Sequence, residues 1–172
     1  MRRAGRSKPR NAACVPQSRK IHTATDNKGC SRILRQHKRP DCGNMSKRFL
    51  IVEDEIFVAL DMEHILTSLG CEVVGIAADQ ETALSLGPTA DAALVDVNLR
   101  DGHTGPEIGR RLANEFGVRV VFVTANPAQL GDGIKGALGV VSKPISDNSL
   151  IATVNYLAAA DGPPPTELRL FA

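Results

Sequence analysis

From residue 49 onward, short apolar runs alternate with longer amphipathic stretches, and this alternation restricts the fold more than any other feature. The apolar runs are residues 49–52, 71–77, 92–95, 118–123 and 138–141. Five such runs, each followed by an amphipathic stretch, predict five strand–helix units. Continuously apolar strands that alternate with helices are typical of a parallel sheet covered on both faces, with right-handed crossovers.

The amphipathic stretches carry helix signals of unequal strength. One helical face begins at Val58 and ends at Leu69, just before Gly70. Asp79, Thr104 and Ser146 stand where N-caps are expected, and Thr104 has a glutamate three residues later, the spacing of a capping box. The stretch 127–139 carries Gly131, Gly133 and Gly136, so its helix is expected to be short or weak.

Composition sets outer limits on the class of protein. The 172 residues suffice for one domain with a tail, and 42% hydrophobic and 23% charged residues are ordinary for a globular chain. No apolar run approaches the roughly 18 residues that span a bilayer, so no membrane association is expected. Trp is absent and aromatic residues make up 3%, which speaks against stacking platforms for single-stranded nucleic acid.

The net charge of +2 hides two opposite halves. Residues 1–44 hold 12 Lys and Arg against 2 Asp and Glu, whereas the rest holds 9 against 17. We therefore expect a disordered basic arm (1–45), a folded domain (46–160) and a flexible tail (161–172). The arm has three explanations: a nucleic-acid-binding segment, a targeting peptide, or a start codon assigned too far upstream of Met45.

The cysteines favour a reducing, cytoplasmic setting. Three of them lie in the basic arm near two histidines, but their spacing fits no compact zinc finger (Cys14, Cys30, Cys42, His22, His37). The fourth, Cys71, follows a glycine at the start of an apolar run and is expected to be a small buried hydrophobe.

Chemically reactive residues stand where four of the five predicted strands end. Glu53 and Asp54 follow the first strand, Asp96 the third, Thr124 the fourth and Lys143 the fifth. In an open α/β sheet, ligands bind outside the carboxyl ends of the strands, so these side chains are expected to share one crevice. Neighbouring carboxylates repel, which a bound Mg²⁺ would relieve. An Asp in such a site can accept a phosphoryl group.

The segments that carry these residues resemble the receiver domains of two-component response regulators over about residues 47–160. The matching segments are 51–55 (IVEDE), 94–99 (LVDVNL), 121–125 (VFVTA) and 142–144 (SKP). The resemblance implies a flavodoxin-like (βα)5 fold with strand order 2-1-3-4-5. It also implies that Asp96 is the phosphoacceptor. Glu53, Asp54, Asp96 and the backbone carbonyl of Asn98 would hold Mg²⁺.

The resemblance assigns roles to further residues. Thr124 corresponds to the switch hydroxyl and Lys143 to the phosphate-binding lysine, with a cis peptide expected before Pro144. Asn98 and Asn126 match positions that tune dephosphorylation. Val140 stands where the family usually has an aromatic residue, so activation is expected to be read out differently. The run Thr124-Ala125-Asn126-Pro127 and the short, Gly-rich stretch between Thr124 and Lys143 are similar to atypical receivers of alphaproteobacterial stress signalling.

Together these observations predict a single-domain response regulator rather than a metabolic enzyme. A sensor histidine kinase or phosphotransfer protein would phosphorylate Asp96, and the domain would relay the signal to another protein or act as a phosphate sink. Two alternatives remain open: a receiver that gates a nucleic-acid-binding arm, and an interaction module independent of phosphorylation. A haloacid-dehalogenase phosphatase fits poorly because position 98 is Asn rather than a general acid. A flavodoxin-like carrier fits poorly because Glu53–Glu55 would repel a flavin phosphate.

Overall fold

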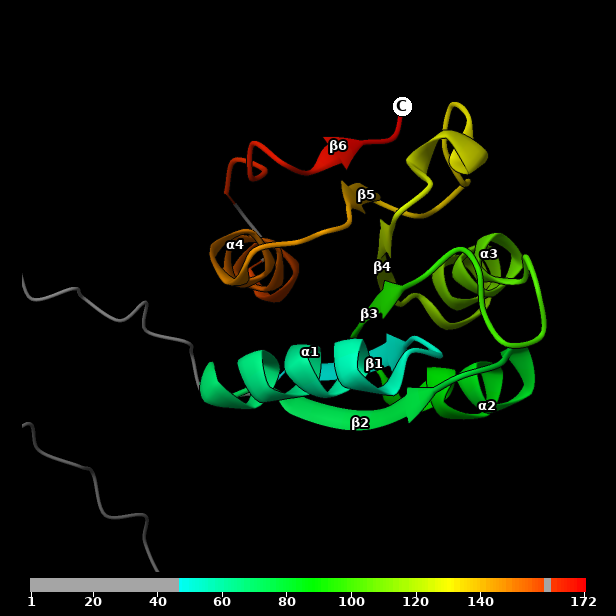
Figure 1. Ribbon diagram of the computed structural model, residues 1–172, viewed down its shortest axis with the longest axis horizontal. Coiled ribbons are helices and arrows are strands. Elements are labelled where there is room, and N and C mark those ends of the chain that lie inside the picture. Colours follow the sequence, from blue (N-terminus) through cyan, green and yellow to red (C-terminus); the bar gives the residue numbers. More distant parts are fainter. Residues whose placement is uncertain (1–46, 160–161) are drawn as a thin grey trace, which may run out of the picture. The chain divides into compact units, whose positions relative to one another are not determined.

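A six-stranded sheet, ordered β2-β1-β3-β4-β5-β6, forms the centre of the computed structural model, which describes residues 47–159 and 162–172 (Figure 1). The predicted basic arm lies outside these residues. Five strands are parallel and confirm the predicted order: β1 (Arg48–Val52), β2 (Glu72–Ala77), β3 (Ala92–Val95), β4 (Arg119–Thr124) and β5 (Gly139–Ser142). A short sixth strand, β6 (Arg169–Leu170), pairs antiparallel with β5.

Helices cover both faces of this sheet (Figure 1). The α-helices are α1 (Ile56–Ser68), α2 (Gln80–Leu86), α3 (Gly105–Phe116) and α4 (Asp147–Ala158). Two 3₁₀ turns complete the elements, η1 (Gly87–Thr89) and η2 (Pro127–Leu130). Helices α1 and α4 pack beside each other on one face, and α2 and α3 pack on the other.

The apolar strands are continuous in sequence because both of their faces are buried. In β1, Phe49 and Ile51 enter the core beneath α1 and α4, whereas Leu50 and Val52 enter the core beneath α2 and α3. Because successive side chains of a strand point to opposite faces, one run of apolar residues contributes to both cores. Among the described helices, none combines the length and the hydropathy needed to cross a bilayer.

All three residues predicted to cap helices stand at N-cap positions, and two of them make the side-chain cap hydrogen bond. The Asp79 carboxylate accepts from the Thr82 N–H at 2.9 Å, and the Ser146 hydroxyl accepts from the Ser149 N–H at 3.2 Å. The predicted capping box at Thr104 is wrong. Its hydroxyl donates to the Asp101 carboxylate at 2.6 Å and makes no cap hydrogen bond to α3. Asp101 competes with the backbone of α3 for the Thr104 hydroxyl, because the turn before α3 brings the Asp101 carboxylate within hydrogen-bond distance.

The chain between β4 and β5 contains only the 3₁₀ turn η2 and further turns, not an α-helix. This agrees with the weak helix expected from Gly131, Gly133 and Gly136. Leu130 is buried in the core beneath α2 and α3, and Ile134 and Ala137 are packed against that core. These apolar side chains anchor a segment that lacks regular structure.

The expectation of a flexible tail is wrong for its last residues. Gly139 pairs with Leu170 and Val140 with Arg169, and Leu168 is 5% exposed. The reason is that apolar side chains alternate here: Leu168 joins the core beneath α1 and α4, while Phe171 packs against the opposite core. This segment therefore covers the edge of β5.

Candidate functional site

An open crevice of about 310 Å³ lies at the carboxyl ends of β1, β3, β4 and β5. Six of the sequence-predicted residues line it: Asp54, Asp96, Asn98, Thr124, Asn126 and Lys143. The crevice forms because the parallel strands end at the same edge of the sheet. There, the loops after neighbouring strands turn towards opposite faces of the sheet and leave a gap between them. The structure therefore brings together the residues that the strand ends selected.

A lysine joins two carboxylates at the floor of the crevice. The Lys143 ammonium donates to Glu53 Oε2 at 2.6 Å and to Asp96 Oδ2 at 2.7 Å. The Glu53 side chain is 1% exposed, against 10% for Asp96 and 14% for Lys143. Glu53 thus lies beneath the crevice, and Asp96 faces it.

Burial and charge act in opposite directions on this triad. Burial raises the pKa of Glu53 above its usual range, and the hydrogen bond from Lys143 only partly offsets this. Burial alone would lower the pKa of Lys143, but its hydrogen bonds to Asp96 and Glu53 outweigh burial and raise the pKa. The ammonium is therefore held charged between the two acids.

Backbone amides hold the second oxygen of Asp96. Oδ1 accepts from the Val97 N–H at 2.5 Å and more weakly from the Asn98 N–H at 3.4 Å. With Lys143 on the other oxygen, both carboxylate oxygens have a defined donor. These hydrogen bonds fix the orientation of a carboxylate, and a carboxylate oriented in this way can act as a nucleophile.

The remaining predicted residues occupy distinct places. Thr124 is fully buried, and its Oγ1 accepts from the Asn126 N–H at 3.2 Å. The peptide between Lys143 and Pro144 is cis. Val140 is 2% exposed and belongs to the core beneath α2 and α3, so it does not line the crevice.

Sequence reasoning did not select Gln129 and His103, which contact a crevice residue. The Asn98 side-chain amide donates to Gln129 Oε1 at 3.1 Å, and His103 Nδ1 lies 3.3 Å from Asn98 Oδ1. Gln129 lies in η2, after β4, and His103 lies in the loop between β3 and α3. Both residues are several positions beyond the strand ends, so the position of the strand ends alone did not indicate them.

The donor set fits a magnesium ion. Asp54 and Asp96 place carboxylates on the crevice, and Asn98 adds oxygen donors beside them. Within residues 47–159 and 162–172 there is no ready-made cluster of three or more His, Cys, Asp or Glu side chains. Mg²⁺ does not require one, because it commonly binds one or two carboxylates and keeps several waters.

Comparisons with known proteins agree with this geometry. The Phyllosphere-induced regulator PhyR of Methylorubrum extorquens is 28% identical over 116 residues, which cover 65% of this chain and 43% of PhyR. The chain thus spans less than half the length of that relative.

Solved structures show the same relationship. The PhyR receiver domain of Erythrobacter litoralis is 28% identical, with a TM-score of 0.61 over 70% of this chain and 96% of that domain. PhyR from Brucella abortus is 31% identical, with a TM-score of 0.55 over 66% of this chain and 48% of that protein. The model of the response regulator receiver domain family matches residues 49–155, and this chain belongs to that family.

Proposed function

We propose that the domain accepts a phosphoryl group on Asp96 from a histidine kinase or phosphotransfer protein, with Mg²⁺, and passes its state to a partner protein. One observation supports this most directly. The Lys143 ammonium contacts the Asp96 carboxylate in a crevice that also presents Asp54 and Thr124. That arrangement supplies a nucleophile, a cation for the phosphoryl oxygens, a metal-binding acid and a hydroxyl donor.

The chemistry is a phosphoryl transfer between side chains. A carboxylate oxygen of Asp96 attacks phosphorus, the bond from phosphorus to the donor histidine nitrogen breaks, and that nitrogen keeps the electron pair. Lys143, now 2.7 Å from Asp96, would bond a phosphoryl oxygen, and Thr124 would donate to another. The domain acts as a signalling phosphoacceptor and not as a metabolic enzyme.

Magnesium would be held by Asp54, Asp96 and the Asn98 carbonyl, with Glu53 acting through water. When bound, the ion neutralises charge that develops on the phosphoryl oxygens. Glu53 also keeps Lys143 charged from below, through the 2.6 Å contact between Nζ and Oε2.

A docking surface for the phosphodonor adjoins the crevice. A groove of about 470 Å³ runs between α1 and α4, with apolar walls from Val58, Met62 and Leu150. Lys143 and Ala125 line both the groove and the crevice, so the two are continuous. A donor helix seated in this groove could present its histidine to Asp96.

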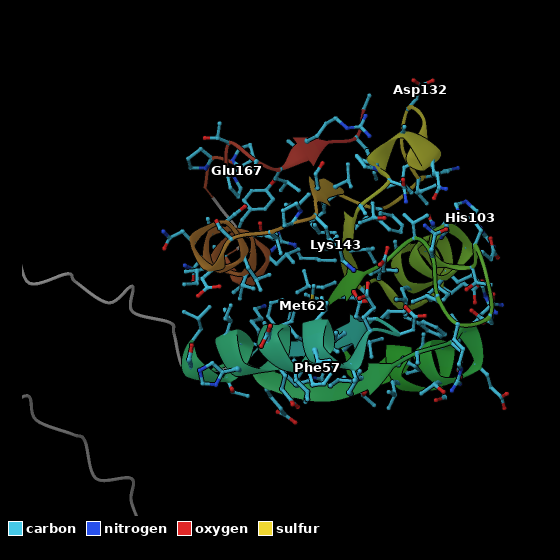
Figure 2. The ribbon with its side chains drawn as sticks, viewed as in Figure 1. Phe57, Met62, His103, Asp132, Lys143 and Glu167 are labelled. Carbon is cyan, nitrogen blue, oxygen red and sulfur yellow. The ribbon has the colours of Figure 1, made fainter. Side chains whose placement is uncertain are left out.

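A second set of exposed apolar side chains lies at the N-terminal end of α1, on other sides of the helix than the groove. Ile56, Phe57 and Leu60 are 55%, 80% and 45% exposed. Figure 2 shows Met62 on the side of α1 that faces α4 and Phe57 on another side. Large apolar side chains on an exposed helix commonly mark a protein interface.

The downstream step is proposed only at the level of a protein partner. One related structure, from Bartonella quintana, is an anti-anti-sigma factor PhyR, and 25% of the aligned residues are identical. This chain covers 49% of that protein. For this chain, phosphorylation would change a protein-binding surface, or the domain would store phosphate.

The test is phosphorylation with a small phosphodonor, acetyl phosphate, with and without Mg²⁺, followed by intact mass. We expect one added phosphoryl group that requires Mg²⁺ and disappears in Asp96→Asn. Asp132→Asn removes an exposed acid far from the crevice (Figure 2) and should behave as the wild type. Label that persists in Asp96→Asn would refute the assignment. No label and no Mg²⁺ binding would instead favour an interaction module independent of phosphorylation.

A further inference from the structure

The C-terminal segment around β6 is built into both cores of the domain. Phe171 packs on Phe122, with ring centroids 6.2 Å apart, and its N–H donates to the Leu138 carbonyl at 3.0 Å. Leu168, on the opposite face, is buried beneath α1 and α4. Figure 1 shows this segment (red) beside β5 and close to the loop that precedes it (yellow).

Arg169 connects this segment to η2. Its guanidinium donates to the carbonyls of Gly131 at 3.4 Å and Pro127 at 3.5 Å, and it lies 5.6 Å from the centre of the Phe171 ring. Arg169 pairs with Val140, so Arg169 and Phe171 lie on the side of the sheet that faces η2. Arg169 thus bonds both ends of the turn, and the Phe171 ring lies against its guanidinium.

The same turn is bonded to the crevice. The Thr124 hydroxyl accepts from Asn126, which immediately precedes η2, and the Gln129 N–H donates to the Asn126 carbonyl at 3.0 Å. The Gln129 side chain accepts from Asn98 at 3.1 Å. A continuous series of contacts therefore runs from the crevice through η2 to Arg169.

We propose that the C-terminal segment orders η2, and that Arg169 and Phe171 are positioning residues for the Thr124 side of the phosphorylation site. This inference rests on the proposed function. The segment between β4 and β5 has only one 3₁₀ turn and three glycines, so fixing it costs conformational entropy. Because the C-terminal segment already packs against η2, part of the conformational entropy of η2 is lost before a phosphoryl group binds. Linkage then requires that a ligand at Asp96 also strengthens the attachment of the segment.

The experiment compares Arg169→Ala and Phe171→Ala with Leu170→Ala in the full chain. Leu170 is 44% exposed and points to the face away from η2, so it is the matched control. The first measurement is amide hydrogen exchange of residues 125–131 without ligand. The second is the affinity for beryllofluoride, a phosphoryl analogue, with Mg²⁺ present.

We expect faster exchange at 125–131 in Arg169→Ala and Phe171→Ala, and beryllofluoride binding weaker by about 5-fold. Leu170→Ala should stay within about twofold of the wild type, and Phe171→Leu should recover most of the affinity because it restores apolar packing. In the wild type, beryllofluoride should slow exchange at 168–171.

A merely structural role would give a different result. If both alanine variants lose thermal stability but bind beryllofluoride as tightly as Leu170→Ala at a temperature where β1 and β3 stay protected, the proposal is overturned. Unchanged exchange at 125–131 would overturn it as well. If the wild type binds no beryllofluoride, the proposed function fails, whereas the exchange measurement still tests whether the segment orders η2.

Discussion

The two crossovers on either side of β4 are held in different ways. The crossover from β3 to β4 is the twelve-residue helix α3, whose Ile108 and Leu112 are fully buried. The crossover from β4 to β5 is a 3₁₀ turn followed by further turns, and a strand from the far end of the described chain packs beside it. The first crossover is fixed by its own helix, and the second by contacts distant in sequence.

This difference divides the candidate site. Asp96 belongs to the side fixed by α3, and Thr124 leads into the turn-rich side. Lys143, at the end of β5, reaches across to Glu53 and Asp96 and joins the two sides. We infer that the proposed phosphoacceptor, Asp96, is rigidly placed, while the proposed switch hydroxyl, Thr124, adjoins the less stable part of the fold.

The largest effect is expected from Gly105→Ala, which tests the rigid side. A Cβ at this first residue of α3 would lie 2.0 Å from the Asp96 carbonyl oxygen and 2.6 Å from the Val97 Cα. Because backbone cannot yield there without moving β3, we expect destabilisation of at least about 3 kcal/mol, measured by urea unfolding. Glu107→Ala, exposed in the same turn of α3, is the control. Full stability of Gly105→Ala would show that the α3 junction is not rigid.

The next effect is expected from Lys143→Met, which removes the link between the two sides. Glu53 would stay buried without its partner, which we expect to cost about 2 to 4 kcal/mol at pH 8. Burial raises the pKa of Glu53, so the folded variant takes up a proton more readily than the unfolded chain. The cost should therefore shrink as the pH falls towards 5, in urea unfolding at several pH values.

The double variant Glu53→Gln with Lys143→Met separates charge from packing. The neutral amide removes the buried charge, so at pH 8 the double variant should be more stable than Lys143→Met alone. A cost of Lys143→Met that stays constant from pH 8 to 5 would show that Glu53 is not the source of the penalty.

A smaller effect is expected from Gly139→Ala, which tests the turn-rich side. A Cβ at this position of β5 would lie 2.3 Å from the Arg169 carbonyl oxygen. Because β6 is a short edge strand, it can move away, and we expect a loss of only about 1 to 2 kcal/mol with the rest of the fold intact. Amide exchange should become faster at 168–171 but not in β1. Ser142→Ala, exposed on the same strand, is the control, and uniform loss of protection would contradict the comparison.

Sequence patterns predicted the rigid side better than the turn-rich side for a physical reason. The strands β1, β3 and β4 are buried on both faces, so their apolar runs are visible without knowledge of any partner. Their ends then indicated Asp54, Asp96 and Thr124, because parallel strands finish at one edge. These features depend on residues close together in the chain.

The features that were missed depend on pairing between distant residues. The direct contact of Glu53 with Lys143 joins residues 90 positions apart and follows from strand order and register. The residues Leu168 to Phe171 follow a proline-rich run and are too few to show a period. The alternation of these side chains between the two faces of the sheet becomes predictable only when the free edge of β5 is known.

The smallest effect on stability is expected from Phe57→Ser. Phe57 lies outside both crossovers, so this variant provides a reference for the effects at Gly105 and Gly139. Phe57 is 80% exposed on α1, so its replacement should change the free energy of unfolding by less than about 0.5 kcal/mol. Labelling by acetyl phosphate should be unchanged because the crevice residues are untouched. Transfer from a phosphorylated histidine kinase or phosphotransfer protein should slow, since the donor would lose an apolar contact on α1. Glu63→Gln, on the same helix, is the control. Equal loss with both donors would place the defect in the crevice and not in docking.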